Sequence, residues 1–224
     1  MNYSDYQRAF SPARLARYCN ACNNDQNKAM RLYRLNVKLC QKFYGMLNIL
    51  EIVLRNAINE HYKAHLNDPN WIMTHTQQGG IVELSPHQYN VIKTAQKLTA
   101  AGKYTHDRLV AGVSFGFWTY LFNKIPFRRG GQNLHLIFPN RPIGTGQKQI
   151  FRELSEIKEF RNKIAHHDPI CFDTAGNIDL TFARSNRDRI LTYLHYLGYR
   201  KEEILYGFDI STLPIINKID ELAV

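Results

Sequence analysis

The sequence predicts a mainly α-helical fold, and two features carry this prediction. Apolar residues recur every three to four positions over long stretches, which is the spacing that places side chains on one face of a helix. Candidate helix starts also occur, at Ser11-Pro12 and Ser85-Pro86, where a serine precedes a proline at the first helical position. At 224 residues, 44% of them hydrophobic, the chain is long enough for one substantial core. We therefore expect one helical domain over residues 1–224, with residues 1–25 as an N-terminal helical extension.

The first half of the chain contains three expected helices. A short one runs over residues 11–22, and a long one over about 26–65 forms the spine of the fold, with Gly45 as a candidate kink. Asn67-Asp68-Pro69 ends the long helix, and a third helix follows over about 86–101.

A fourth helix is expected over residues 105–122, because bulky apolar residues keep helical spacing there. This segment is rich in aromatic residues: Phe115, Phe117, Trp118, Tyr120 and Phe122. Aromatic rings of this kind can stack on nucleic-acid bases, but at helical spacing we favour a place in the core.

The second half of the chain begins with a connection rich in proline and glycine, residues 123–147. A strongly periodic helix is expected next, over 148–166, and then a small hairpin or an irregular loop over 168–184. Asn186 is expected to cap a helix through residue 197, and residues 210–222 are expected to form a terminal helix.

The composition favours a polyanionic partner. The formal net charge is +10 and the pI is about 9.5. The start of the chain lacks the apolar segment of a secretory signal, and the longest apolar run, residues 113–122, is too short to cross a bilayer, which takes about 20 residues. We therefore expect a soluble cytoplasmic protein with no membrane partner.

The four cysteines (Cys19, Cys22, Cys40, Cys171) do not form the pattern of a disulfide framework, so reduced thiols are expected. Cys19-x-x-Cys22 is the start of many zinc sites, but no second Cys or His pair stands at a matching distance. We expect no cofactor and no metal.

The segment Arg161-Asn162-Lys163-Ile164-Ala165-His166-His167-Asp168-Pro169 carries the clearest functional signal. Arginine presents a fork of donors that suits phosphate oxygens, and histidine exchanges protons near neutral pH. Counting about 100° per residue, Arg161 falls on the apolar face that Ile150 and Leu154 begin, where an unpaired guanidinium would be costly. These residues indicate chemistry on a phosphodiester, with Asn162 placed to orient a side chain or the substrate.

Two histidines compete for the catalytic role. His166 and His167 point about 100° apart on a helix, so only one can face the same groove as Arg161. We favour His166 and keep His167 as the alternate.

Two further groups of residues are candidates for supporting roles. Glu51 and Arg55 stand one helical turn apart; an ordinary i,i+4 ion pair is the favoured interpretation, and the sharper one makes Glu51 a partner of Arg161 or Arg55 a second phosphate contact. Basic residues before and within the 148–166 helix are candidates for binding a phosphate backbone: Arg128, Arg129, Arg141, Lys148, Arg152, Lys158 and Lys163. Gly144-Thr145-Gly146 lies just before that helix and is expected to be a flexible linker rather than an anion site.

The chain resembles the Abi-like (AbiD/AbiF type) abortive-infection proteins of the HEPN superfamily. The resemblance rests on three segments in order: Glu51-x-x-Leu54-Arg55-x-x-Ile58, Val113-Ser114-Phe115-Gly116-Phe117-Trp118, and Arg161-Asn162-Lys163-Ile164-Ala165-His166, which fits the superfamily's R-x4-6-H signature. Together they span roughly residues 30–200.

This resemblance implies a HEPN-like helical bundle with long irregular loops that forms a homodimer, bringing two arginines and two histidines into one composite cleft. It further implies a metal-independent ribonuclease of anti-phage defence or toxin type that acts on RNA. An antitoxin or a small non-coding RNA is a candidate partner that would restrain it. Two other hypotheses stay open: a non-catalytic RNA-binding module of the same fold, and a zinc-dependent regulator that uses Cys19 and Cys22.

Overall fold

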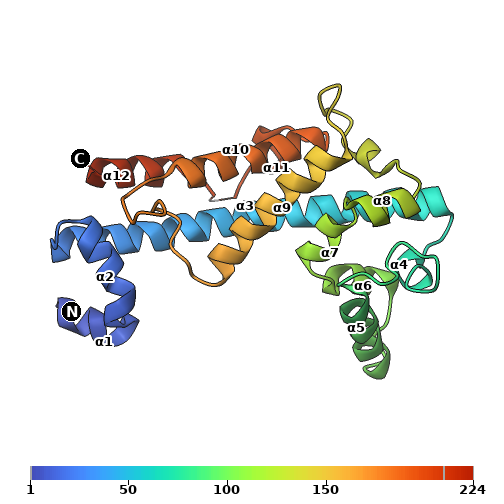
Figure 1. Cartoon of the computed structure of the whole chain (residues 1–224), viewed down its shortest axis with the longest axis horizontal. Helices are drawn as coiled ribbons and strands as arrows, with labels where there is room; N and C mark the ends of the chain where they lie inside the picture. Colours follow the sequence, from blue (N-terminus) through green and yellow to red (C-terminus); the bar gives the residue numbers. More distant parts are fainter. Residues whose placement is uncertain (1, 209, 224) are drawn as a thin grey trace. The chain divides into compact units, whose positions relative to one another are not determined.

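A computed structural model describes residues 2–208 and 210–223 and confirms a mainly α-helical fold (Figure 1). In these residues the only β-structure is an isolated antiparallel bridge between Phe172 and Ile178. The chain divides into two compact units. Unit 1 comprises Met1–Asn48, Glu159–Leu191 and Glu202–Val224, and unit 2 comprises Ile49–Lys158 and Thr192–Lys201. No helix of the described chain is long and apolar enough to cross a membrane.

The longest element is α3, Gln26–Leu66, which matches the helix expected over 26–65 (Figure 1). Most of its apolar stripe is buried, as the periodicity predicts: Leu32, Leu39, Phe43, Leu47, Leu50, Leu54 and Ile58 are all at most 4% exposed, whereas Leu35 is half-buried. The helix continues through Gly45, where a Cβ atom would lie only 2.6 Å from Cγ2 of Ile210. Gly45 is thus explained by close packing, and not by a break in the helix.

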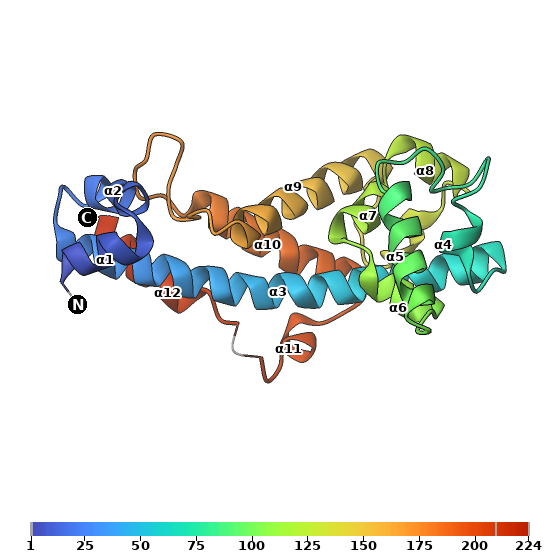
Figure 2. The ribbon, with the colours of Figure 1, turned by 90° about the horizontal axis from the view of Figure 1, so that it is seen from below.

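Unit 1 contains the N-terminal helices α1, Tyr3–Phe10, and α2, Pro12–Ala21, and the C-terminal helix α12, Leu213–Ala223. Ser11 caps α2 as expected, because its hydroxyl accepts a hydrogen bond from the backbone N–H of Arg14. α12 lies beside the N-terminal part of α3 (Figures 1 and 2), where Arg31 and Glu221 form an ion pair at 3.9 Å.

The core of unit 1 is aromatic around the end of α9, Gln147–Ala165. The ring of Phe160 meets Phe43 edge-on at a centroid distance of 4.8 Å and Phe182 at 5.4 Å. Phe182 belongs to α10, Thr181–Tyr196. These contacts fix which side of the last turns of α9 faces the interior of unit 1.

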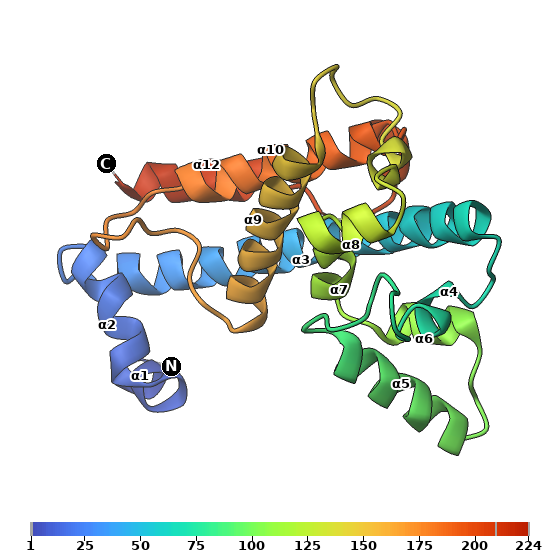
Figure 3. The ribbon, with the colours of Figure 1, turned by 45° about the vertical axis from the view of Figure 1, so that its right-hand side comes forward.

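Unit 2 is built from short helices around the second half of α3. They are α4 (Trp71–Thr74), α5 (Gln88–Ala100), α6 (His106–Gly112), α7 (Phe115–Tyr120), α8 (Lys124–Arg129) and the 3-10 helix η1 (Leu134–Ile137), and α5 packs against α6 (Figure 3). Its core contains Trp71 and Trp118, both fully buried. Four aromatic residues of the 115–122 segment are also buried and Tyr120 is half-buried, so packing, and not base stacking, accounts for them.

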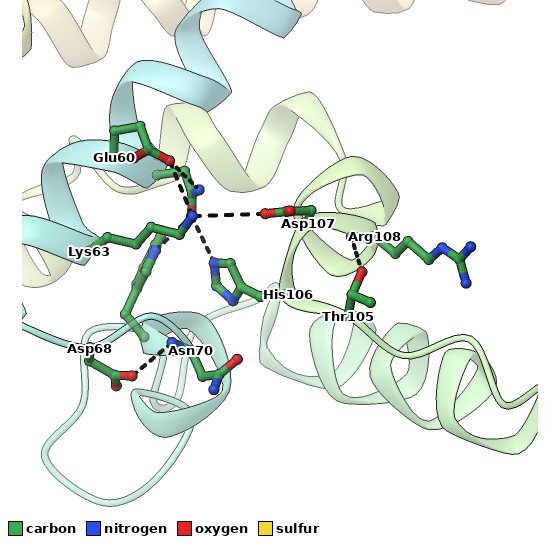
Figure 4. A network of polar contacts seen from close by, with 10 residues as sticks. Glu60, Lys63, Asp68, Asn70, Thr105, His106, Asp107 and Arg108 are labelled. Atoms are coloured by element: carbon green, nitrogen blue, oxygen red, sulfur yellow. Dashed lines mark hydrogen bonds and ion pairs between the residues drawn. The ribbon is translucent and has the colours of Figure 1, made fainter.

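A polar network joins α3 to α4 and α6 inside unit 2. Oδ1 of Asn59 accepts hydrogen bonds from Nε1 of Trp71 at 3.0 Å and from Nε2 of His106 at 2.8 Å. The indole N–H can only donate, so the oxygen of Asn59 faces both rings and Nε2 of His106 carries the proton. At the rim of this network, Lys63 reaches Glu60 at 3.2 Å and Asp107 at 3.8 Å (Figure 4).

The prediction of one continuous helix over residues 105–122 is wrong. Residues 105–122 form two helices, α6 and α7, because the backbone is extended at Val113 (ψ 148°) and Ser114 (ψ 158°). Gly112 ends α6 and brings its backbone close to α5, since a Cβ there would lie 2.8 Å from Cγ2 of Thr94. Periodicity alone cannot detect such a break, because both short helices are apolar.

Two other expectations also need correction. The connection over 123–147 is not irregular throughout, since it contains α8 and η1. Asn186 is not a helix cap: α10 begins at Thr181, whose N–H donates to Oδ1 of Asp179 at 2.6 Å. Asn186 is buried within α10, where its side chain donates to the carbonyl of Phe182 and accepts from Arg189. An asparagine whose side chain bonds to the backbone of its own helix cannot be told from a capping asparagine by sequence alone.

Candidate functional site

The R-x4-H segment lies in the last turns of α9, inside unit 1. Arg161 is half-buried, and among the described residues it has no hydrogen-bond or ion-pair partner. A guanidinium can bury its aliphatic stem while its charged end stays in water, so this position is tolerable but leaves the donors available to a ligand. Asn162 is also half-buried, and its carbonyl accepts the N–H of His166 at 2.9 Å.

The apolar face of α9 is buried, but Arg161 does not lie at its centre. Ile150, Leu154 and Ile157 are fully buried, as expected, and Ile164 is 6% exposed, whereas Ala165 is exposed. Phe160, which is not among the residues that predicted the apolar face, is fully buried and takes the inward position in the last turns through its contacts with Phe43 and Phe182. The buried stripe therefore turns away from Arg161, and packing within unit 1 already covers this end of the face. A second copy of the helix is not needed to explain the half-burial of Arg161.

The two histidines occupy different positions at the end of α9. The N–H of Asp168 donates to the carbonyl of Lys163 at 2.8 Å, and the N–H of His167 donates to the carbonyl of Ile164 at 3.0 Å. This pair of bonds is a Schellman motif, in which the residue after the helix takes a left-handed conformation that is usually reserved for glycine. Here that residue is His167, with φ 59°, and His166 stands just before it. Both histidines are exposed.

A cavity of about 670 Å³ lies beside this motif and belongs entirely to unit 1. His167 lines it, together with Ile164 and Ala165 from the end of α9, whereas His166 does not. The remaining walls come from α2 and α3: Arg14, Tyr18, Tyr33, Asn36, Val37, Cys40, Gln41 and Tyr44. Sequence reasoning missed all of these α2 and α3 residues as site residues, because most of them read as parts of the amphipathic pattern of their helices.

Hydrogen bonds between residues far apart in the sequence hold the wall of the cavity together. Nη2 of Arg14 donates to the carbonyl of His167 at 3.1 Å, and Oδ1 of Asn36 accepts the backbone N–H of Ile170 at 3.0 Å. The rings of Tyr18 and Tyr33 meet edge-on with centroids 5.2 Å apart. These contacts hold the end of α9 against α2 and α3.

The supporting residues Glu51 and Arg55 lie on the part of α3 that belongs to unit 2, and both are half-buried. Nε of Arg55 is buried and has no hydrogen-bond partner in the described chain.

The candidate RNA-binding residues differ in how available they are. Arg128, Lys148 and Lys163 are exposed, and Lys158 is half-buried. Three arginines already have partners. Arg129 pairs with Glu83 at 3.3 Å, Arg152 with Glu153 at 3.6 Å, and the guanidinium of Arg141 donates to the carbonyl of Phe138 at 3.2 Å. The exposed side chains of Arg128, Lys148 and Lys163 can offer charge to phosphates, whereas Arg129, Arg141 and Arg152 also have a structural role.

The loop before α9 is anchored at its end. Gly144 has φ 90°, Thr145 is buried, and the side-chain amide of Gln147 donates to the carbonyl of Phe122. These contacts within unit 2 hold the segment that was expected to be a flexible linker.

The cysteines are free thiols in the structure, and the described residues contain no group of three or more His, Cys, Asp or Glu placed to hold a metal ion. Burial raises the pKa of Cys22 and Cys171, and it raises the pKa of Cys40 to about 11. At neutral pH these three thiols are therefore protonated.

Comparison with known proteins gives no relative from which a function could be transferred. No family model matches the chain, and no match is found among curated proteins or solved structures.

Proposed function

We propose that the chain is a metal-independent endoribonuclease of bacterial anti-phage (abortive infection) defence or toxin type, with its site at the end of α9. The observation that carries the proposal is the half-buried Arg161, which has no partner in the described chain and stands five residues before the exposed His166. A guanidinium without an acid partner keeps its donors for a phosphate, and a nearby imidazole can move a proton.

The chemistry follows from RNA itself. The 2'-hydroxyl attacks the adjacent phosphorus while His166 takes its proton, the bond from phosphorus to the 5'-oxygen breaks, and that oxygen gains a proton. The products are a 2',3'-cyclic phosphate and a 5'-hydroxyl end. Arg161 stabilises the negative charge that builds on the phosphate oxygens, and Asn162 orients a side chain or the substrate. His167 is the alternate for the proton transfer.

A homodimer would supply a second arginine and a second histidine to the site, as the resemblance to HEPN proteins implies. Free charge for the RNA backbone is available at Arg128, Lys148 and Lys163, which are exposed. The net charge of +10 supports a polyanionic substrate. An antitoxin or small non-coding RNA is the proposed restraint on such an activity.

The second candidate is a non-catalytic RNA-binding module. It is favoured by one observation: among the described residues, no hydrogen bond orients the ring of His166. Catalytic histidines are commonly held by a third group.

The test is cleavage of single-stranded RNA in EDTA by the wild-type chain and by Arg161→Ala, Arg161→Lys, His166→Ala and His167→Ala. We expect Arg161→Ala and His166→Ala to lose at least about a hundredfold in rate, the size typical of general acid–base and charge-stabilising groups. Arg8→Ala and His195→Ala are matched controls, since both residues are exposed and far from α9 in sequence. Full activity in Arg161→Ala and His166→Ala would refute the assignment. Salt-dependent RNA binding without cleavage would favour the binding module.

A further inference from the structure

The cavity beside the end of α9 combines aromatic walls with positive charge. Tyr18, Tyr33 and Tyr44 contribute phenol rings, and Arg14 contributes a guanidinium. No aspartate or glutamate is among its lining residues, and the thiol of Cys40 stays neutral at pH 7 because burial raises its pKa to about 11. A ligand for this cavity should therefore be planar and apolar in one part and anionic in another.

The size of the cavity fits a ligand of that kind. Its volume of about 670 Å³ lies inside the range of roughly 300–1,000 Å³ that is usual for small-molecule pockets. Tyr44 is 56% exposed and Val37 is 39% exposed, so the cavity is reached from outside along one side of α3. Tyr18 and Tyr33 are 3% and 8% exposed and pack edge-on against each other, so their positions are set before a ligand arrives.

At the mouth of the cavity, the backbone of His167 has an unusual conformation. His167 has φ 59°, a left-handed conformation that costs free energy for any residue with a Cβ atom, and its carbonyl is held by Arg14. Glycine is the usual residue here, yet the chain has an imidazole that lines the cavity. Strained residues of this kind occur often at ligand sites.

We infer that this cavity binds one nucleotide of an RNA strand, with the base against Tyr44 and the phosphate near Arg14 and His167. Aromatic rings stack on any base and guanidinium groups bind phosphate oxygens, so the two features of the cavity match the two parts of a nucleotide. The inference rests on the proposed action on RNA. It adds a base-binding pocket beside the phosphate site, on residues that the R-x4-H segment does not include.

Equilibrium binding of a short fluorescent RNA is the test, measured for the wild type and for Tyr44→Ala, Tyr44→Phe and Val37→Trp in the full-length chain. We expect Tyr44→Ala to weaken binding at least about fivefold, which corresponds to about 1 kcal/mol, the lower end for stacking on one base. Tyr44→Phe keeps the ring and should bind like the wild type. Val37→Trp should weaken binding by filling the cavity. The matched control is Tyr89→Ala, which removes an exposed tyrosine from α5 in unit 2.

A second arm distinguishes a free nucleotide from one within a strand. Adenosine and uridine monophosphates are titrated by calorimetry against the wild type and Val37→Trp. RNA binding that depends on Tyr44, with weak or absent binding of either monophosphate, supports a strand-bound nucleotide. Tight binding of a monophosphate that Val37→Trp abolishes, with RNA affinity unchanged, would overturn the strand-bound assignment.

The outcomes also separate this inference from the proposed function. Unchanged RNA affinity in both Tyr44→Ala and Val37→Trp, while Arg161→Ala still abolishes cleavage, would overturn the pocket and leave the ribonuclease standing. Absence of cleavage by the wild type, with RNA affinity that still depends on Tyr44, would refute the ribonuclease and support the pocket. Thermal unfolding of each variant checks that the fold is intact.

Discussion

Replacing His167 with glycine should stabilise the protein, although it removes a side chain from the candidate site. His167 has φ 59° at the end of α9, where a residue with a Cβ atom pays about 1–2 kcal/mol. Glycine avoids that cost, but it loses about 0.5–1 kcal/mol through the greater freedom of the unfolded chain. The net gain in free energy of unfolding should be about 0.5–1 kcal/mol. The hydrogen bond from Arg14 to the carbonyl of residue 167 involves only the backbone there, so it is kept.

The measurement compares His167→Gly with His167→Ala by urea and thermal unfolding. Alanine also lacks the imidazole but keeps the Cβ atom, so the difference between the two variants isolates the backbone conformation. We expect the glycine variant to unfold at a temperature about 2–4 °C above the alanine variant, which corresponds to about 1 kcal/mol for a chain of this size. Equal stability of the two variants, or a more stable alanine variant, would refute the reasoning.

The same pair of variants bears on the choice between the histidines. If His166 moves the proton, His167→Gly should keep most of the cleavage rate at saturating RNA while gaining stability, although its affinity for RNA should fall because the imidazole beside the phosphate is lost. If His167 does so, both variants should lose activity to the same degree, whatever their stability.

Two further predictions concern the polar network of unit 2. Asn59→Leu should remove the acceptor of Trp71 and His106 and lower the free energy of unfolding by roughly 2–6 kcal/mol, at about 1–3 kcal/mol for each stranded donor; Asn56→Leu, an exposed position on the same helix, is the matched control in urea unfolding, and equal losses would contradict the network's role. Burial holds the pKa of His106 below its usual value of 6.5, so the unfolded chain binds a proton that the folded chain does not, and stability should fall as pH drops below about 6.5. Urea midpoints at pH 7.5 and 5.5 measure this effect, and a higher midpoint at pH 5.5 would contradict it.

Local patterns predict the long elements well. The apolar repeat of α3 and the Ser11 cap of α2 are confirmed because one face of each helix and one hydrogen bond are encoded by neighbours in sequence. The break at Val113 and the burial of Asn186 escape prediction. The helical spacing of apolar residues continues across Val113, so the break cannot be seen in the sequence. Asparagine is also a common helix-capping residue, so its type alone does not show that Asn186 lies inside a helix.

The candidate site divides in the same way. Arg161 and His166 are found by residue type and spacing on one helix. The place of Arg161 at the edge of the buried stripe depends on Phe160, whose partners Phe43 and Phe182 come from two other helices. The cavity depends on residues from α2, α3 and α9, up to 153 positions apart for Arg14 and His167, so no window of sequence contains it.

The sequence by itself determined the helical class of this protein, its long α3 helix, its excess of positive charge and the R-x4-H segment. The helical features depend on side chains within a few turns of one another, and the excess of positive charge is the sum of the charged residues. Only the tertiary structure decided that His167 takes a left-handed conformation, that it lines an aromatic cavity with Arg14, and that Arg161 is half-buried without a partner in the described chain. These features arise from packing between distant segments, whose free energy local propensity does not contain.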